Sequence, residues 1–138
     1  MIFTDAESRF LTRQERGHLS TIGAAGWPQV KPLGFAYNAA LETIDITGYA
    51  MASSAKYRNV QAVPRVAFVV DEVTEPTAQG AHFLEIRGIA ETVTHVSTDP
   101  HLDPEIIRIR PLRVIAYNVG PDQPGLYARN VTDQTAGA

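Results

Sequence analysis

Hydrophobic and polar residues alternate with a period of two along much of this chain, and that period is typical of β-strands with one buried face. The apolar run at residues 66–70 differs, since it is typical of a strand buried on both faces. Gly88 indicates a bulge in one strand, and Pro111 is expected to interrupt another. The pattern predicts six strands, over residues 18–22, 29–37, 41–47, 65–71, 82–96 and 105–117.

Two short helices are expected beside these strands. Thr4 and Glu7 have the spacing of a capping box, which predicts a helix over residues 4–14. A second helix is expected over residues 55–63, where two serines precede it and a proline follows. Six strands with mostly hairpin-length connections and two outer helices indicate a mainly β fold, a compact antiparallel barrel.

The length of 138 residues suits one domain, which we assign to residues 1–131. Residues 120–130 show no regular pattern and are expected to form an irregular arm. Residues 132–138 are small and polar, and we expect them to be disordered.

The composition excludes several classes of function. The chain has no cysteine, so disulfides, thiolate metal sites and cysteine nucleophiles are ruled out. The net charge of −3 offers no general basic surface for nucleic acid. No apolar run approaches the roughly 20 residues of a membrane span, and the N-terminus lacks the features of a signal peptide. We therefore expect a cytoplasmic protein without nucleic-acid or membrane partners.

The start of the second helix holds the best local candidate for a ligand site. Ser53, Ser54 and Lys56 surround a first helical turn whose N–H groups are free and whose dipole end is positive. Lysine is used at only two positions of the chain, and a compact ammonium suits a phosphate. The segment fits a phosphate site. The alternative is a capped surface helix with solvated charges.

Residues 29–35 form the second candidate. Pro32 and Gly34 leave backbone groups uncommitted within a strand, which lets a flat ligand approach closely. Lys31 shares a face with Leu33, an unusual place for a charge unless it reaches the rim. The alternative is an edge strand whose proline and lysine prevent aggregation.

Other catalytic patterns are missing or weak. The chain has no Gly-x-Ser-x-Gly elbow, no Rossmann glycine pattern and no P-loop. The four histidines lack metal-ligand spacing, so no metal site is expected. Arg108, Arg110 and Arg113 cluster on the last predicted strand, where either a solvated or subunit-facing strand or an anion site would explain them.

Four ordered pieces of the sequence together resemble a known family. They are residues 17–22 with 28–35, residues 53–60 with 63–69, residues 83–91, and residues 113–116 with 128–131. In this order and spacing they make residues 5–130 resemble the small flavin and deazaflavin oxidoreductases of the pyridoxamine 5′-phosphate oxidase-like superfamily. The chain is most similar to the actinobacterial branch described as coenzyme F420-dependent.

The resemblance implies a split β-barrel that forms a homodimer, with two cofactor sites at the dimer interface. It also implies which positions hold the cofactor: Ser53, Ser54, Lys56 and Asn59 at its phosphate, Gln29, Val30, Lys31, Pro32 and Leu33 beneath its ring system, Thr47 on the adjacent strand, and Arg129 from the C-terminal arm. The longer C-terminal segment with which the pyridoxal-phosphate-forming members bind substrate has no counterpart here. Pyridoxine chemistry is therefore not expected.

The resemblance further implies an oxidoreductase in which reduced coenzyme F420 gives a hydride to a conjugated small molecule, such as an enone, a quinone or a tetrapyrrole-like acceptor. No catalytic residue is assigned, because the cofactor carries the chemistry and the protein positions it. One alternative is an FMN-dependent oxidase or reductase of the same fold, since both cofactors combine a phosphate with a tricyclic ring. The other is a non-catalytic protein that binds a flavin, a deazaflavin or haem.

Overall fold

The computed structural model describes residues 1–95 and 99–131. Seven strands, two α-helices and two short 3₁₀ helices make up this part of the chain. In chain order they are α1 (Asp5–Arg13), β1 (Arg16–Ile22), β2 (Pro28–Asn38), β3 (Thr43–Ile46), η1 (Met51–Ser53), α2 (Ala55–Ala62), β4 (Arg65–Val73), η2 (Ala78–Gly80), β5 (Ala81–Thr94), β6 (Glu105–Tyr117) and β7 (Leu126–Asn130).

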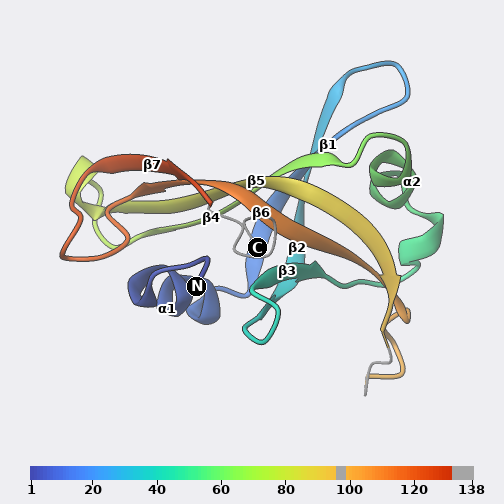
Figure 1. Cartoon of the computed structure of the whole chain (residues 1–138), viewed down its shortest axis with the longest axis horizontal. Helices are drawn as coiled ribbons and strands as arrows, with labels where there is room; N and C mark the ends of the chain where they lie inside the picture. Colours follow the sequence, from blue (N-terminus) through green and yellow to red (C-terminus); the bar gives the residue numbers. More distant parts are fainter. Residues whose placement is uncertain (96–98, 132–138) are drawn as a thin grey trace.

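Six strands close into an antiparallel barrel. The neighbours run in the order β3-β2-β1-β4-β5-β6, and β3 pairs with β6 to complete the ring. The predicted six-stranded barrel with two short helices is confirmed. Figure 1 shows α1 and β7 towards one end of the long axis and α2 towards the other.

The expectation of an irregular arm at residues 120–130 is wrong for residues 126–130, because these form β7, which pairs with the C-terminal half of β6. Asn118 takes a left-handed backbone conformation and its side chain accepts a hydrogen bond from Gly125 N at 2.7 Å. Gly125 itself has a φ of 81°, which glycine adopts without strain. These two residues reverse the chain so that it runs back along β6. The reversal depends on their backbone conformations and not on an alternating apolar pattern, so the sequence pattern did not indicate it.

The predicted irregularity at Gly88 is confirmed, but the extra residue lies on the neighbouring strand. Gly88 pairs with Pro111 and Arg87 pairs with Arg113, which leaves Leu112 of β6 unpaired in the bulge. A Cβ at position 88 would stand 2.3 Å from Arg110 O, so the close approach requires glycine. Pro111 therefore does not interrupt β6, because the bulge accommodates its missing N–H.

The expectation that residues 66–70 are buried on both faces is wrong within a single chain. Val66, Phe68 and Val70 point into the barrel and are buried, whereas Ala67 and Val69 are only half-buried on the outside. The barrel interior is filled by large apolar side chains, among them Leu19, Ile44, Ile46, Phe68, Leu84, Ile86, Ile107 and Ile109. The outer face of β4 is thus apolar without a covering layer of its own chain.

A buried ion pair joins the two strands that close the barrel. Arg108 of β6 donates to both carboxylate oxygens of Asp45 on β3, from Nε at 3.0 Å and from a terminal nitrogen at 3.1 Å. Thr43 and Asn38 donate to the same carboxylate at 3.0 and 3.1 Å. Burial acts to raise the pKa of Asp45, but these hydrogen bonds and the Arg108 charge outweigh it and lower the pKa.

The predicted capping box of α1 is confirmed, and its glutamate has a second role. Thr4 Oγ1 accepts from Glu7 N, and Glu7 Oε1 accepts from Thr4 N at 2.9 Å. Glu7 is fully buried, where it pairs with Arg129 of β7 and accepts a 2.7 Å hydrogen bond from the Tyr127 hydroxyl. Burial and the contact with Glu7 raise the pKa of Tyr127. One carboxylate therefore holds α1 against β7.

Among residues 1–95 and 99–131, no helix combines the length and the apolar character that crossing a membrane requires. The tail expected to be disordered, residues 132–138, lies outside the described residues.

Replacing Asp45 by Asn should lower the free energy of unfolding by about 3 kcal/mol at pH 7, because the Arg108 charge loses its buried partner. The folded-state pKa of Asp45 is lowered, so its contribution is complete above the unfolded-state pKa of about 3.9 and is lost as the pH falls through the folded-state pKa. Urea unfolding from pH 7 to pH 2 should show the difference between the two proteins shrinking in acid.

Glu72→Gln is the matched control, because Glu72 pairs with Arg13 at the surface, where an ion pair contributes at most about 1 kcal/mol. Equal losses in the two variants at pH 7 would contradict the role assigned to the buried pair.

Candidate functional site

The N-terminus of α2 is built by the two serines before it. Ser54 is the N-cap, since its Oγ accepts from Tyr57 N at 3.3 Å, and the same hydroxyl donates to Met51 O at 2.6 Å. Ser53 Oγ donates to Ala50 O at 3.0 Å. Each hydroxyl has one proton to donate, and both protons are used within the turn. The serines therefore shape the turn, and they have no donor left for an incoming anion.

Lys56 lies in the first turn of α2 and is half-buried. Among the described residues it makes no hydrogen bond or ion pair, so its three ammonium donors remain available. Tyr57 N and Arg58 N are bonded to Ser54, which leaves the N–H groups of Ala55 and Lys56 at the helix end. This lysine and two N–H groups are the donors that a phosphate would meet.

Asn59 connects α2 to the β1–β2 hairpin. Its amide nitrogen donates to Thr21 Oγ1 and to Gln29 Oε1, both at 2.9 Å. The structure thus brings together two of the predicted positions, Gln29 and Asn59. The amide hydrogens are used by protein partners, so this contact positions the hairpin over the helix. Thr21 was not predicted, because only the strand register places it beside Asn59.

The first part of β2 has an open edge. Residues 28–34 pair with β1 on one side, while β3 pairs only with Phe35–Asn38. Phe35 N donates to Glu15 O, and Trp27 O accepts from Gly23 N, so the odd-numbered positions bond towards β1. The even-numbered positions consequently face the open edge.

Two of those four edge positions cannot donate a hydrogen bond. Pro28 and Pro32 lack an N–H, so Val30 and Gly34 supply the donors along this stretch. Thr47 directly follows β3, at the point where that strand separates from β2. A flat ligand with a carbonyl at its rim can lie against this edge and accept from Val30 N.

The other predicted cofactor positions, Lys31, Leu33 and Arg129, lie in three different environments. Gln29, Lys31 and Leu33 share one face of β2. Lys31 lies near the open end of that face and is exposed, whereas the Leu33 side chain is in the barrel core with 8% exposure. Arg129 donates to Ile2 O at 3.0 Å and pairs with the buried Glu7. Within one chain the structure does not bring Arg129 to the group around α2.

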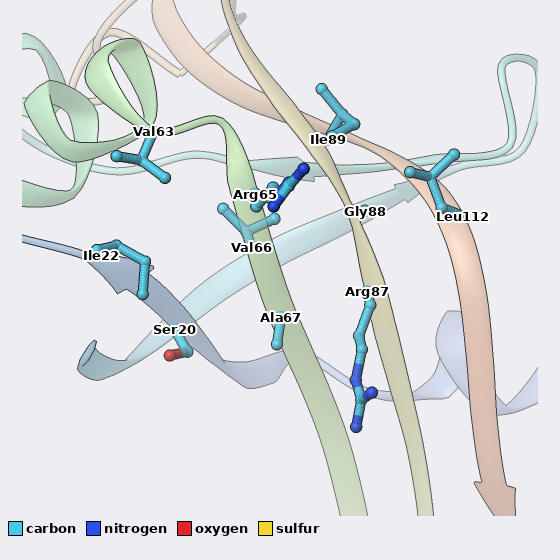
Figure 2. Close-up of a pocket in the computed structure, with 10 residues that line it drawn as sticks. All are labelled: Ser20, Ile22, Val63, Arg65, Val66, Ala67, Arg87, Gly88, Ile89 and Leu112. Carbon is cyan, nitrogen blue, oxygen red and sulfur yellow. The ribbon is translucent and has the colours of Figure 1, made fainter. Parts of the chain in front are cut away.

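A pocket of about 530 Å³ opens on the outer face of the barrel (Figure 2). Its walls are mostly apolar, from Ile22, Val63, Ile89 and Leu112, and two arginines, Arg65 and Arg87, stand among them. This pocket was not predicted from the sequence, because its residues come from β1, β4, β5 and the β6 bulge and meet only through strand register. The one sequence signal for it was that Arg65 falls on the outward-facing positions of the alternating strand β4.

A smaller pocket of about 190 Å³ adjoins the first one and shares Ser20 and Ala67 with it. Its lining includes the Val30 side chain and Phe83. The hollow on the outer face therefore extends from the open edge of β2 towards Leu112.

Comparison with known proteins identifies relatives that cover most or nearly all of the chain. A protein of Streptomyces rimosus named 5a,11a-dehydrotetracycline/5a,11a-dehydrooxytetracycline reductase is 36% identical over 140 residues, covering 99% of both chains. A solved structure titled F420 reductase is 28% identical with a TM-score of 0.62, covering 79% of this chain and 95% of its own. A conserved hypothetical protein of Mycobacterium tuberculosis shares the fold, with a TM-score of 0.68 and 21% identity, over 98% of this chain and 96% of its own.

The named relatives support an oxidoreductase. Residues 3–118 match the family described as Pyridoxamine 5′-phosphate oxidase, which is most of the chain and confirms the resemblance drawn from the sequence. The chain therefore belongs to the pyridoxamine 5′-phosphate oxidase family.

Proposed function

We propose that this protein is a reductase that uses reduced coenzyme F420 to transfer a hydride to a conjugated small-molecule acceptor. The observation that carries the proposal is the 36% identity, over 99% of both chains, with a relative named as a reductase of dehydrotetracyclines. That name denotes reduction of an unsaturated polycyclic molecule. The similarity to a structure titled F420 reductase favours the deazaflavin as the hydride source.

The donors of α2 and of the open edge of β2 fit a cofactor with a phosphate and a flat ring system. Lys56 and the free N–H groups of α2 would hold the phosphate, and Val30 N and Gly34 N would face carbonyl oxygens at the ring edge. The bound cofactor supplies the hydride. The chain's own part is to bind, orient and exclude water, which explains why no pair of acid and base side chains is needed.

The ring must bind outside the barrel, because the interior is filled by side chains. We propose that a second copy of the chain supplies the opposite wall of the site. Apolar side chains on the outer face support this homodimer: Val30 is 62% exposed, Leu112 is 42% exposed, and Ala67 and Val69 are half-buried beside them. A second copy would also provide the covering layer that β4 lacks.

FMN is the second candidate cofactor, since the donors around Lys56 recognise a phosphate whichever ring it carries. A non-catalytic carrier of flavin, deazaflavin or haem has less support, because the full-length relative is named as a reductase.

Separate titrations of the cofactor-free protein with coenzyme F420 and with FMN test the proposal. Trp27 is 74% exposed at the turn before β2, so its fluorescence reports on ligands that bind along that strand. We expect selective binding of F420, and then oxidation of the reduced cofactor that depends on a dehydrotetracycline-type acceptor. Selective binding of FMN, or binding of F420 without turnover of any conjugated acceptor, would contradict the proposal.

Lys56→Ala should weaken F420 binding about 10- to 100-fold, because a charge-assisted hydrogen bond contributes about 1.5–3 kcal/mol. The titration described above measures the change. Arg9→Ala, an exposed cation on α1, is the control and should bind normally. Unchanged affinity in the Lys56 variant would show that the phosphate binds elsewhere.

Val30→Pro should lower cofactor affinity about 2- to 10-fold with little change in stability, because the N–H it removes faces the open edge and only one hydrogen bond is lost. Lys31→Pro is the matched control, since position 31 bonds towards β1 and its proline breaks the ladder. Thermal unfolding should therefore show a clear loss for Lys31→Pro alone. Similar destabilisation by both prolines would refute the assignment of the edge.

A further inference from the structure

Three arginines occupy neighbouring positions on the outer face, on three adjacent strands. Arg87 of β5 stands directly opposite Arg113 of β6, and it is diagonal to Arg65 of β4, whose partner on β5 is Ile89. Like charges that face each other across strands are destabilising. The chain as a whole has a net charge of −3, so this concentration of positive charge is local.

Neighbouring protein groups neutralise these arginines only in part. Glu85 accepts from Arg87 Nε at 2.8 Å, which leaves both terminal nitrogens of that guanidinium unbonded among the described residues. Arg113 donates to the uncharged Asn130 at 2.7 Å. Arg65 makes no hydrogen bond or ion pair with the described residues. Among the described residues, the only carboxylate that pairs with any of the three guanidinium groups is that of Glu85, and it pairs with Arg87 alone.

Two of the three arginines border the 530 Å³ pocket, whose volume lies within the range of about 300–1,000 Å³ that small-molecule sites occupy. Figure 2 shows Arg65 beside Ile89, while the side chain of Arg87 extends past Ala67 at the other end. Ile22 and Val63 form the wall on one side, and Leu112 stands on the other. A flat apolar body fits between these walls, and an anionic oxygen on it would meet a guanidinium.

The pocket also lies apart from the phosphate donors assigned on α2. Successive side chains of a strand point to opposite faces, and Thr21 of β1 points to Asn59 of α2. Ser20, which lines the pocket, therefore points away from the helix that holds the phosphate donors. The smaller pocket extends from this pocket to the Val30 side chain, and no residue of α2 lines it.

We propose that this pocket binds the acceptor, a flat and largely apolar molecule with an anionic oxygen such as an ionised enol, phenol or carboxylate, and that Arg65 and Arg87 select for its charge. The inference rests on the proposed reductase function and names the substrate class for it. The apolar walls recognise the ring system, and the guanidinium groups recognise the anion.

A pair of dyes that differ only in charge tests the selection. 1-Anilinonaphthalene-8-sulfonate is flat and anionic, and N-phenyl-1-naphthylamine is the same ring system without the sulfonate. Fluorescence titration of the wild-type protein should give tighter binding of the anionic dye. Arg65→Gln and Arg87→Gln should each weaken the anionic dye about 10-fold and change the neutral dye less than about two-fold.

Two further variants separate charge from shape. Leu112→Ala should weaken both dyes, because it removes an apolar wall. Arg9→Gln on α1, outside the pocket, should change neither. Equal effects of the arginine variants on both dyes would overturn the charge selection. The pocket lies on the face that the proposed second copy would cover, so the titrations are made on the dimer. Absence of dye binding would overturn the site, because it would show that no cavity remains between the two copies.

Competition separates this inference from the proposed function. Saturating F420 should leave the affinity of the anionic dye within about two-fold, and a dehydrotetracycline-type acceptor should displace the dye. Displacement by F420 would assign the pocket to the cofactor and overturn the acceptor site. Failure of F420 to bind at all would refute the proposed function and the acceptor role, whereas the dye comparison would still report on anion selection by the pocket.

Discussion

The filled interior of the barrel determines where this protein can bind anything. Large apolar side chains from all six barrel strands meet at the centre, and Phe35 packs edge-on against Phe68 with ring centroids 5.0 Å apart. Such close packing leaves no interior room for a ligand with three fused rings. Every group that could serve a ligand is therefore displaced to a strand edge, a helix end or the outer face.

Each outer surface offers a ligand a different kind of chemical group. The open edge of β2 offers backbone donors, α2 offers an ammonium group and helix N–H groups, and the outer face offers apolar area with guanidinium groups. The Asn59 amide fixes the first two surfaces relative to each other through Gln29. Hydrogen bonds within the chain therefore hold these surfaces in place, and the ammonium and guanidinium groups stay available for ligands.

Local signals in the sequence were sufficient for some of these features. The Thr4 and Glu7 capping box, the serine cap of α2 and the irregularity at Gly88 each depend on residues that are close in sequence or on one special backbone position. These features could be predicted because the interactions that define them span only a few residues. The cofactor roles of Lys56 and Val30 come from the family resemblance and stay predictions.

The features that could not be predicted from the sequence depend on contacts between residues far apart in the chain. β7 was missed because a five-residue strand has too short a pattern. Arg129 was assigned to the cofactor from the family resemblance, and nothing in the sequence indicated that within one chain it pairs with Glu7, 122 residues away. The pocket was missed since Arg65 and Arg87 become neighbours only through the register of β4 and β5. The outer face of β4 was predicted to be buried because residues 66–70 are all apolar, but a single chain supplies no cover for it.

The contact between Glu7 and Arg129 has a consequence for how the chain reaches its fold. α1 is synthesised first, yet the partner of its buried carboxylate arrives 122 residues later, and barrel closure through Asp45 and Arg108 spans 63 residues. Contacts of such high sequence separation slow folding. During synthesis on the ribosome, Glu7 cannot pair with Arg129 until β7 has emerged, so its carboxylate stays solvated until then. The N-terminal helix, although synthesised first, is therefore among the last elements to complete its packing.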